Sequence, residues 1–273
     1  MLRAMTHRIA ILLLPFILVM ANELTGQETT DEFTERVTAE LRETNPQAAD
    51  LFVQANEARS NADLLNAELL FRQVLELEPG FNHATRRLCG IVLQRGRRNE
   101  ALSLCRDAMQ QAETRENRGA LMDVLLTGYG GAGPPAADLQ EALRHGLIML
   151  NDPDAGLFDL ISTCMAGEAN DELPMLRECS QRLDTVAPHQ GATHYYGWLV
   201  AMSNDDFAAA EDRLELASAD GMDPDLYAEL VQRTQAAKPD RSSTLIPIAS
   251  IVGGFLLVGL VLYWLLGRRP VNA

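Results

Sequence analysis

Apolar side chains recur through the middle of the chain at the three-to-four-residue spacing of amphipathic helices, and short polar stretches separate them. The clearest stripe predicts a helix that Asn61 caps and Pro79 ends. Further helices are predicted at 31–43, before this pattern, and at 224–236, after it. The pattern therefore indicates an all-α domain. The clearest stripe consists of Leu65, Leu69, Phe71, Val74 and Leu75.

The helical pattern repeats at an interval of about 34 residues, and small residues recur at one register position. This interval joins the first two register residues and also the last three, whereas the step between the second and third is longer. The loop-forming sequence GYGGAGPP at 128–135 accommodates the excess, and Gly96 is expected in the turn between two helices. The register residues are Ala67, Ala101, Ala142, Leu176 and Ala210.

This pattern resembles the tetratricopeptide repeat, a helix–turn–helix unit of about 34 residues. The resemblance spans 48–222 and is most specific for 48–115, and the alternative is a generic helical bundle with coincidental spacing. It implies an all-α solenoid of tetratricopeptide-like helical hairpins over 48–236, after an N-terminal segment at 22–47. The residues that carry the resemblance are Ala67, Phe71, Pro79, Leu88, Gly96, Ala101, Ala108, Leu176, Pro188, Gly197, Phe207, Ala210, Leu214 and Ala217.

The first part of the chain, 1–21, has the features of a signal peptide. Arg3 and Arg8 precede an uncharged run at 9–21, which is short for a membrane span and normal for a signal-peptide core. Cleavage is predicted after Ala21, with Gly26 as a second option, and an uncleaved signal anchor is the alternative. Both interpretations carry the following chain across the membrane.

The C-terminal region predicts a single transmembrane helix at 244–266. This uncharged stretch spans about 34 Å as a helix, enough for a bilayer core of about 30 Å. Arg268 and Arg269 favour a cytoplasmic tail at 267–273, and 237–243 is a polar linker. A buried core helix is the alternative. Small residues four apart, Ala249/Gly253 and Ser250/Gly254, suggest a homodimer through this helix.

The net charge of −15 is unevenly distributed along the 273 residues. Neither end, 1–21 or 242–273, contains an acid, so the middle holds all 38 acids and 19 of the 23 bases, a net charge of −19. This balance argues against a nucleic-acid partner. Arginine-rich, lysine-poor composition and the short signal favour a single-pass protein of the bacterial cell membrane that faces the periplasm.

The four cysteines fall into two pairs with similar spacing. Cys89 precedes Cys105 by nearly the same interval as Cys164 precedes Cys179. Cys89 and Cys164 share one repeat position, which places each pair across the two helices of one hairpin. Of the three pairings that four cysteines allow, the register therefore favours 89–105 and 164–179, and export makes disulfides chemically plausible. Four buried free thiols are the alternative.

Motifs of enzymatic chemistry were not found in the sequence, and we expect neither enzymatic activity nor a cofactor. The glycine-rich loop at 130–133 lacks the Lys-Ser/Thr of a phosphate loop. His189 and His194 flank a short loop and form a weak metal-site candidate, although isolated surface histidines near a turn are commoner.

The resemblance implies that the first helix of each hairpin lines a concave face that binds a protein or peptide. Arg86, Arg87, Arg95, Arg97 and Arg98 form a basic island that suits an acidic peptide or a terminal carboxylate. The Lys/Asn set that some family members use for this purpose is matched by Asn56 alone, and a solvated helix end paired with acids is the alternative. The candidate concave-face residues are Phe52, Asn56, Arg59, His83, Arg86, Arg87, Phe158, Tyr195 and Leu199.

These features predict a membrane-anchored, extracytoplasmic scaffold for protein–protein interaction, of the kind that assists assembly of envelope complexes. The alternative is a peptide- or ligand-sensing receptor that signals through transmembrane dimerisation. The short tail after 266 contains no signalling domain, so such a receptor needs a partner within the membrane.

Overall fold

The computed structural model of the chain describes residues 30–129 and 133–239. The predicted signal peptide at 1–21 and the predicted span at 244–266 lie outside these residues. Within the described ranges, no helix has both the length and the apolar character needed to cross a membrane. The helices are α1 (Thr30–Thr44), α2 (Pro46–Ser60), α3 (Leu64–Leu77), α4 (Asn82–Gln94), α5 (Arg98–Gln111), α6 (Arg115–Leu126), α7 (Ala136–Leu150), α8 (Leu157–Ala169), α9 (Leu173–Val186), α10 (Gly191–Ser203), α11 (Phe207–Ala219) and α12 (Pro224–Ala237).

The chain divides into two compact units between Met222 and Asp223. The first unit contains α1 to α11, and the second begins with α12. Asp223 caps α12, because its side chain accepts hydrogen bonds from the backbone N–H groups of Asp225 and Leu226 at 3.1 and 3.0 Å. The bounds of α12 confirm the helix predicted at 224–236.

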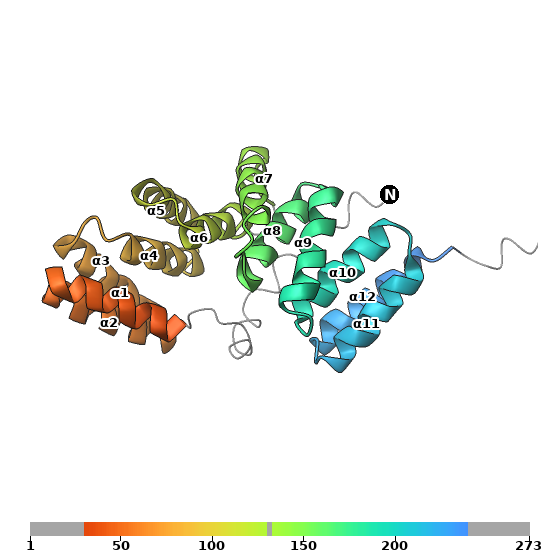
Figure 1. The fold of residues 1–273 in the computed structure, drawn as a ribbon, viewed down its shortest axis with the longest axis horizontal. Helices are drawn as coiled ribbons and strands as arrows, with labels where there is room; N and C mark the ends of the chain where they lie inside the picture. The colour runs from red at the N-terminus through yellow and green to blue at the C-terminus, as the bar shows by residue number, and fades with distance from the viewer. Residues whose placement is uncertain (1–29, 130–132, 240–273) are drawn as a thin grey trace, which may run out of the picture. The chain divides into compact units, whose positions relative to one another are not determined.

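Helices α2 to α11 form consecutive hairpins, α2/α3, α4/α5, α6/α7, α8/α9 and α10/α11, within the first unit (Figure 1). The second helices of the first two hairpins begin at Leu64 and Arg98, and those of the last two begin at Leu173 and Phe207. Each of these pairs of starting points is separated by the repeat interval predicted from the sequence. The first unit is therefore a tetratricopeptide-like array of helical hairpins. The five register residues are all buried, and four of them have no exposed surface.

The irregular step in the repeat is explained by the third hairpin. Helix α7 begins six residues before Ala142, whereas α5 begins three residues before the equivalent Ala101. The connection from α6 to α7 covers 127–135, where the other hairpins have three-residue turns. The extra residues therefore lengthen both this connection and the start of α7, and residues 130–132 of the connection lie outside the description.

The three-residue turns share one backbone conformation. Their middle residue is left-handed, with φ of 58° at Ala62, 76° at Gly96, 56° at Asp171 and 55° at Asp205. Glycine adopts this conformation without steric cost, so the turn predicted at Gly96 is confirmed.

The prediction that Asn61 caps the next helix is wrong. Helix α2 continues to Ser60 and leaves Asn61 in the turn. Asp63 instead caps α3, because its side chain accepts a hydrogen bond from the backbone N–H of Asn66 at 3.2 Å. The capping residue therefore lies at the end of the turn rather than at its start.

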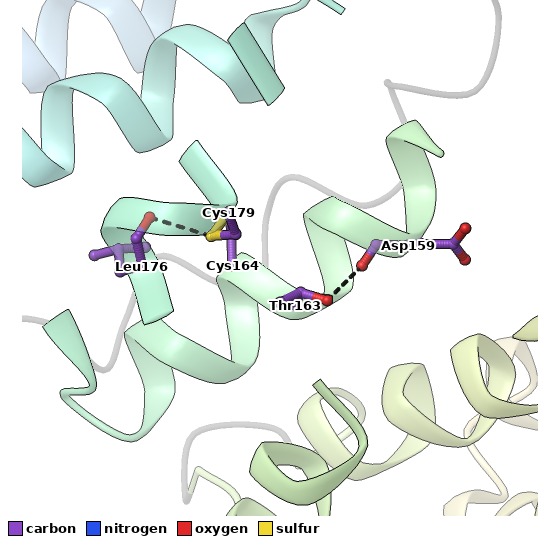
Figure 2. Close-up of a disulfide and its surroundings, with 5 residues drawn as sticks. All are labelled: Asp159, Thr163, Cys164, Leu176 and Cys179. Carbon is purple, nitrogen blue, oxygen red and sulfur yellow. Dashed lines mark hydrogen bonds between the residues drawn. A yellow bond between two sulfur atoms is a disulfide. The ribbon is translucent and has the colours of Figure 1, made fainter. Parts of the chain in front are cut away.

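Each predicted disulfide joins the two helices of one hairpin. Cys89 and Cys105 connect α4 to α5 with 5.5 Å between their Cα atoms, and Cys164 and Cys179 connect α8 to α9 with 5.6 Å. Figure 2 shows the second bridge in the interface between its helices. The pairing favoured by the register is therefore the one the structure contains. All four cysteines are fully buried, so the bridges occupy core positions of their hairpins.

Close packing between α9, α10 and α11 depends on Gly197 in α10. Arg213 of α11 passes over this glycine and donates two hydrogen bonds to Asp184 of α9, at 2.5 and 2.6 Å. A Cβ atom at position 197 would lie 2.7 Å from Nε of Arg213, which is too close for unstrained packing. The glycine therefore allows an ion pair that ties two neighbouring hairpins together.

Candidate functional site

The first helices of the hairpins lie next to one another, because α4 contacts α6 and α6 contacts α8. Helices α2 and α4 also meet, and their side chains bring several predicted site residues together. Arg59 lies in the last turn of α2. His83, Arg86 and Arg87 lie in the first half of α4, where spacings of three and four residues place them on one side of the helix.

Arg59, Arg86 and Arg87 form an arginine cluster that has no acidic partner in the part of the chain that the structure describes. All three side chains are half-buried, and among the described residues no carboxylate lies within ion-pair distance of any of them. Burial, followed by the positive charges of Arg59 and Arg86, lowers the pKa of Arg87 to about 9. Burial also lowers the pKa of Arg86, and the negative charge of Glu116 partly offsets this effect. The cluster therefore concentrates positive charge that no ion pair with a described carboxylate neutralises.

Several polar atoms around the cluster lack a hydrogen-bond partner within the described structure. They include the Nε atoms of all three arginines, Nδ1 of His83 and Oδ1 of Asn56. Asn56 uses its other amide atom, Nδ2, to donate to the carbonyl oxygen of Phe52 at 2.7 Å. Buried donors without partners cost free energy, so an anionic ligand that accepts from the guanidinium groups would relieve both the charge and the hydrogen-bond deficit.

His83 contributes a neutral ring to the cluster. Burial, followed by the charges of Arg86 and Arg87, lowers its pKa from 6.5 to about 4. The ring lies edge-on to Phe33 of α1 and Phe81, with centroid distances of 5.3 and 5.4 Å. At neutral pH the histidine therefore adds no charge to the three arginines.

Aromatic rings support two of the guanidinium groups. Arg87 lies over the ring of Phe52 at 5.6 Å, and Arg86 lies over Phe33 at the same distance. Phe52 is fully buried and packs edge-on against Phe71 and Phe81, so its ring supports the site from within the core. The arginines are thus held in place by cation–π contacts, which leave their charge unneutralised.

The basic island predicted from the sequence separates into two groups. Arg95 and Arg97 contact the carboxylate of Glu68, and Arg98 Nη2 lies 2.6 Å from Oδ2 of Asp138. For these three arginines, pairing with acids is the correct interpretation. The other two members of the island, on α4, have no such partner within residues 30–129 and 133–239, and the structure combines them with an arginine of the preceding hairpin.

Three predicted concave-face residues lie outside the cluster. Phe158 is 59% exposed near the start of α8, whereas Leu199 of α10 is half-buried. Tyr195 is buried, and its hydroxyl donates to Oε1 of Glu168 at 2.8 Å. Their role in binding stays a prediction.

Sequence reasoning missed the part of the site that α1 supplies. Arg87 Nη2 donates to Oγ1 of Thr34 at 3.0 Å, and Phe33 contacts both His83 and Arg86. The apolar spacing of α1 predicts the helix but not the surface on which it packs.

The two candidate metal-binding histidines converge on one carboxylate. His189 Nδ1 lies 3.1 Å and His194 Nε2 lies 2.7 Å from Oδ2 of Asp220. These contacts lower the pKa of Asp220, the bond to His194 having the larger effect. In the described ranges, no group of three or more His, Cys, Asp or Glu residues is arranged to hold a metal ion. Both histidines therefore pair with the same acid, Asp220.

Comparison with known proteins found similarity among solved structures alone. No family model and no curated protein sequence matches the chain. One solved structure that resembles it is the crystal structure of YrrB, described as a TPR protein with an unusual peptide-binding site. The two chains are 18% identical with a TM-score of 0.45, over 73% of this chain and 99% of YrrB. At this level of similarity, assignment of the repeat fold rests on the helices and the register of the chain itself.

Proposed function

We propose that this protein is a membrane-anchored, extracytoplasmic scaffold that binds a protein or peptide partner on its first helices. The arginine cluster receives an acidic group of that partner, either a side-chain carboxylate or a terminal one. The observation that carries this proposal is a set of three half-buried arginines, on adjacent first helices, without an acidic partner among the described residues. A carboxylate matches the paired N–H groups of a guanidinium, which makes this ligand class the best chemical fit.

The membrane location in this proposal is supported by the sequence alone. The uncharged segment at 244–266 suits a single span, and the features of 1–21 suit export. Together they favour a bacterial cell-membrane protein whose bulk lies in the periplasm, where it would assist assembly of envelope complexes. The two buried disulfides of the array suit an oxidising compartment.

The binding test uses the full-length protein in detergent and a fluorescent peptide of alternating glutamate and alanine with a free C-terminus. Arg86→Met/Arg87→Met should weaken binding at least roughly tenfold, because hydrogen bonds to charged groups contribute about 1.5–3 kcal/mol. The matched control is Arg106→Met/Arg177→Met, which removes the same charge from exposed positions and should bind as the wild type does.

Two further peptides identify the group that is bound. An amidated C-terminus removes the terminal carboxylate, and a glutamine version removes the side-chain carboxylates. Loss of binding with one of them assigns that carboxylate to the cluster. Equal weakening by both arginine double variants would show that general charge, rather than the cluster, attracts the peptide, and would contradict the proposal.

Anchoring is tested by deletion of residues 244–266 and fractionation of cells. The shortened protein should move from the membrane fraction to the soluble one, because the other predicted hydrophobic segment, at 9–21, is removed with the signal peptide. Retention in the membrane without a bound partner protein would contradict the proposed topology.

A further inference from the structure

Helix α1 lies on the surface to which the proposed partner would bind. It packs against α2, and the side chains in its first half also reach α4. Phe33 lies between His83 and Arg86, with 5.3 Å between the ring centroids and 5.6 Å from the guanidinium carbon to the phenyl centroid. The hydroxyl of Thr34 accepts from Arg87. The N-terminal half of α1 therefore already occupies one hydrogen-bond donor of Arg87 and one face of the Arg86 guanidinium.

The two halves of α1 are held by different means. Val37 and Leu41 are buried, at 0% and 5% exposure, and anchor the C-terminal half. An exposed ion pair between Arg42 of this half and α2 adds a second contact at 3.1 Å. In the N-terminal half, Phe33 and Thr34 contact α4, and neither of these residues carries a charge. The contacts of Phe33 and Thr34 with α4 are thus uncharged, whereas buried apolar side chains hold the C-terminal half.

The interactions that α1 makes with the cluster are weaker than those of a carboxylate. A hydroxyl accepts a hydrogen bond from Arg87 but does not neutralise its charge, and a phenyl ring attracts Arg86 without neutralising it. A carboxylate both accepts hydrogen bonds and neutralises charge, so it binds the same guanidinium donors more strongly than the hydroxyl or the phenyl ring does. The cluster therefore favours exchange of α1 side chains for an acidic ligand.

We infer that the N-terminal half of α1 is a built-in competitor that covers the arginine cluster and is displaced by the acidic partner. This inference rests on the proposed function of the cluster. Displacement releases Phe33 and Thr34 while Val37 and Leu41 keep the C-terminal half in place. Because only the undocked state is competent to bind, docking of α1 reduces the apparent affinity by the fraction of molecules in that state.

The variant Phe33→Ala/Thr34→Ala tests the competition with the same fluorescent glutamate–alanine peptide and the full-length protein. Removal of both contacts should strengthen peptide binding roughly three- to tenfold, because more molecules have an uncovered cluster. The control Leu65→Ala/Thr185→Ala removes an exposed large apolar side chain and an exposed threonine elsewhere, and should leave the affinity unchanged.

Hydrogen exchange on the wild-type protein provides a second measurement that does not depend on a variant. Saturation with the peptide should increase the amide exchange of residues 33–36 and leave that of α2 unchanged. Unchanged or weaker peptide binding by the α1 variant, or protection of residues 33–36 in the complex, would overturn the inference and make α1 a wall of the site. If the wild type, the α1 variant and the control all fail to bind, the proposed function itself is wrong.

Discussion

Two groups of three arginines occur in the first two hairpins, and their electrostatic surroundings are opposite. In the Glu68 network, one carboxylate of α3 contacts Arg72, Arg95 and Arg97. Its side chain is 4% exposed, so the acid is enclosed by its partners. In the arginine cluster, Arg59 and its two neighbours on α4 surround no acid among the described residues.

This contrast shows that an arginine-rich segment has no single function. Arg87 and Arg95 are close together along α4 and its turn, yet one lies over an aromatic ring and the other contacts a buried carboxylate. Each arginine of the Glu68 network has an ion pair with Glu68, Arg72 and Arg97 have another with Glu100, and the network therefore stabilises the fold. The arginine cluster keeps hydrogen-bonding capacity and positive charge, which makes it the surface that an external acid can use.

The largest effect is expected for Glu68→Gln. Loss of this enclosed charge leaves Glu100 as the acid that still contacts Arg72 and Arg97, and breaking a buried ion pair costs about 3–5 kcal/mol of unfolding free energy. The measurement is urea unfolding followed by circular dichroism. The control is Glu141→Gln, whose partner Arg106 is 44% exposed, with an expected cost below about 1 kcal/mol. Equal costs for the two variants would mean that the Glu68 network is only a surface pair.

A somewhat smaller effect is expected for removal of a disulfide. The pair Cys89→Ala/Cys105→Ala releases α4, which carries two of the three arginines of the cluster, and should cost about 3 kcal/mol of unfolding free energy for a loop of this length. Cys164→Ala/Cys179→Ala should cost about as much. Only the first variant should also weaken binding of the acidic peptide. Equal weakening by both would show that general stability, not the position of α4, controls binding.

The same substitution should have opposite signs in the two groups. Arg87→Met keeps an apolar stem over Phe52 and removes a desolvated charge, so we expect a gain of about 1 kcal/mol in unfolding free energy. Arg95→Met removes a partner of Glu68 and should lose about 1 kcal/mol or more. Chemical denaturation of both variants checks the contrast. A loss of stability in Arg87→Met would show that the cluster is satisfied without a ligand.

The smallest effect concerns the acid sensitivity of the cluster. The pKa of His83 is about 4 in the folded protein and returns to the ordinary value of 6.5 on unfolding, so the unfolded chain binds the proton more readily. Stability should therefore fall as pH decreases from 6.5 towards 4, because His83 favours folding only while it is neutral. Since the side chain is half-buried, the loss is about 0.5 kcal/mol between about pH 7 and pH 5. Denaturation curves of His83→Gln at the two pH values should lack this pH-dependent loss of unfolding free energy. An identical pH response of the wild type and the variant would refute the prediction.

Much of the fold follows from local patterns in the sequence. Ala67 and Ala101 mark the repeat because close helix contacts require small residues there, and both are fully buried. The turn at Gly96 follows from its freedom to adopt positive φ, and the disulfide pairs follow from similar spacing within a repeat. These features recur at a fixed interval, so each repeat in the sequence supports the structure predicted for the others.

The charges of the candidate site were only partly predictable. The sequence placed Arg59, Arg86 and Arg87 on first helices, but it also grouped two of them with Arg95, whose partner Glu68 lies 27 residues earlier. Such a pairing depends on which side chains the hairpins bring within ion-pair distance. The spacing of apolar residues shows which side chains share one face of a helix. It does not show how far apart the charged side chains of two different hairpins lie.

The helical repeat, its register and the cysteine pairs follow from the amino-acid sequence alone, because each depends on residues close together along the chain or related by a constant interval. The packing of the hairpins fixed which arginines have an acidic partner, and it placed Phe33 and Thr34 of α1 on two that have none among the residues the structure describes. Ion pairs and ring contacts form only within a few ångströms. The arginines reach their acidic and aromatic partners because separate helices pack together, and residue spacing within one hairpin does not determine that packing.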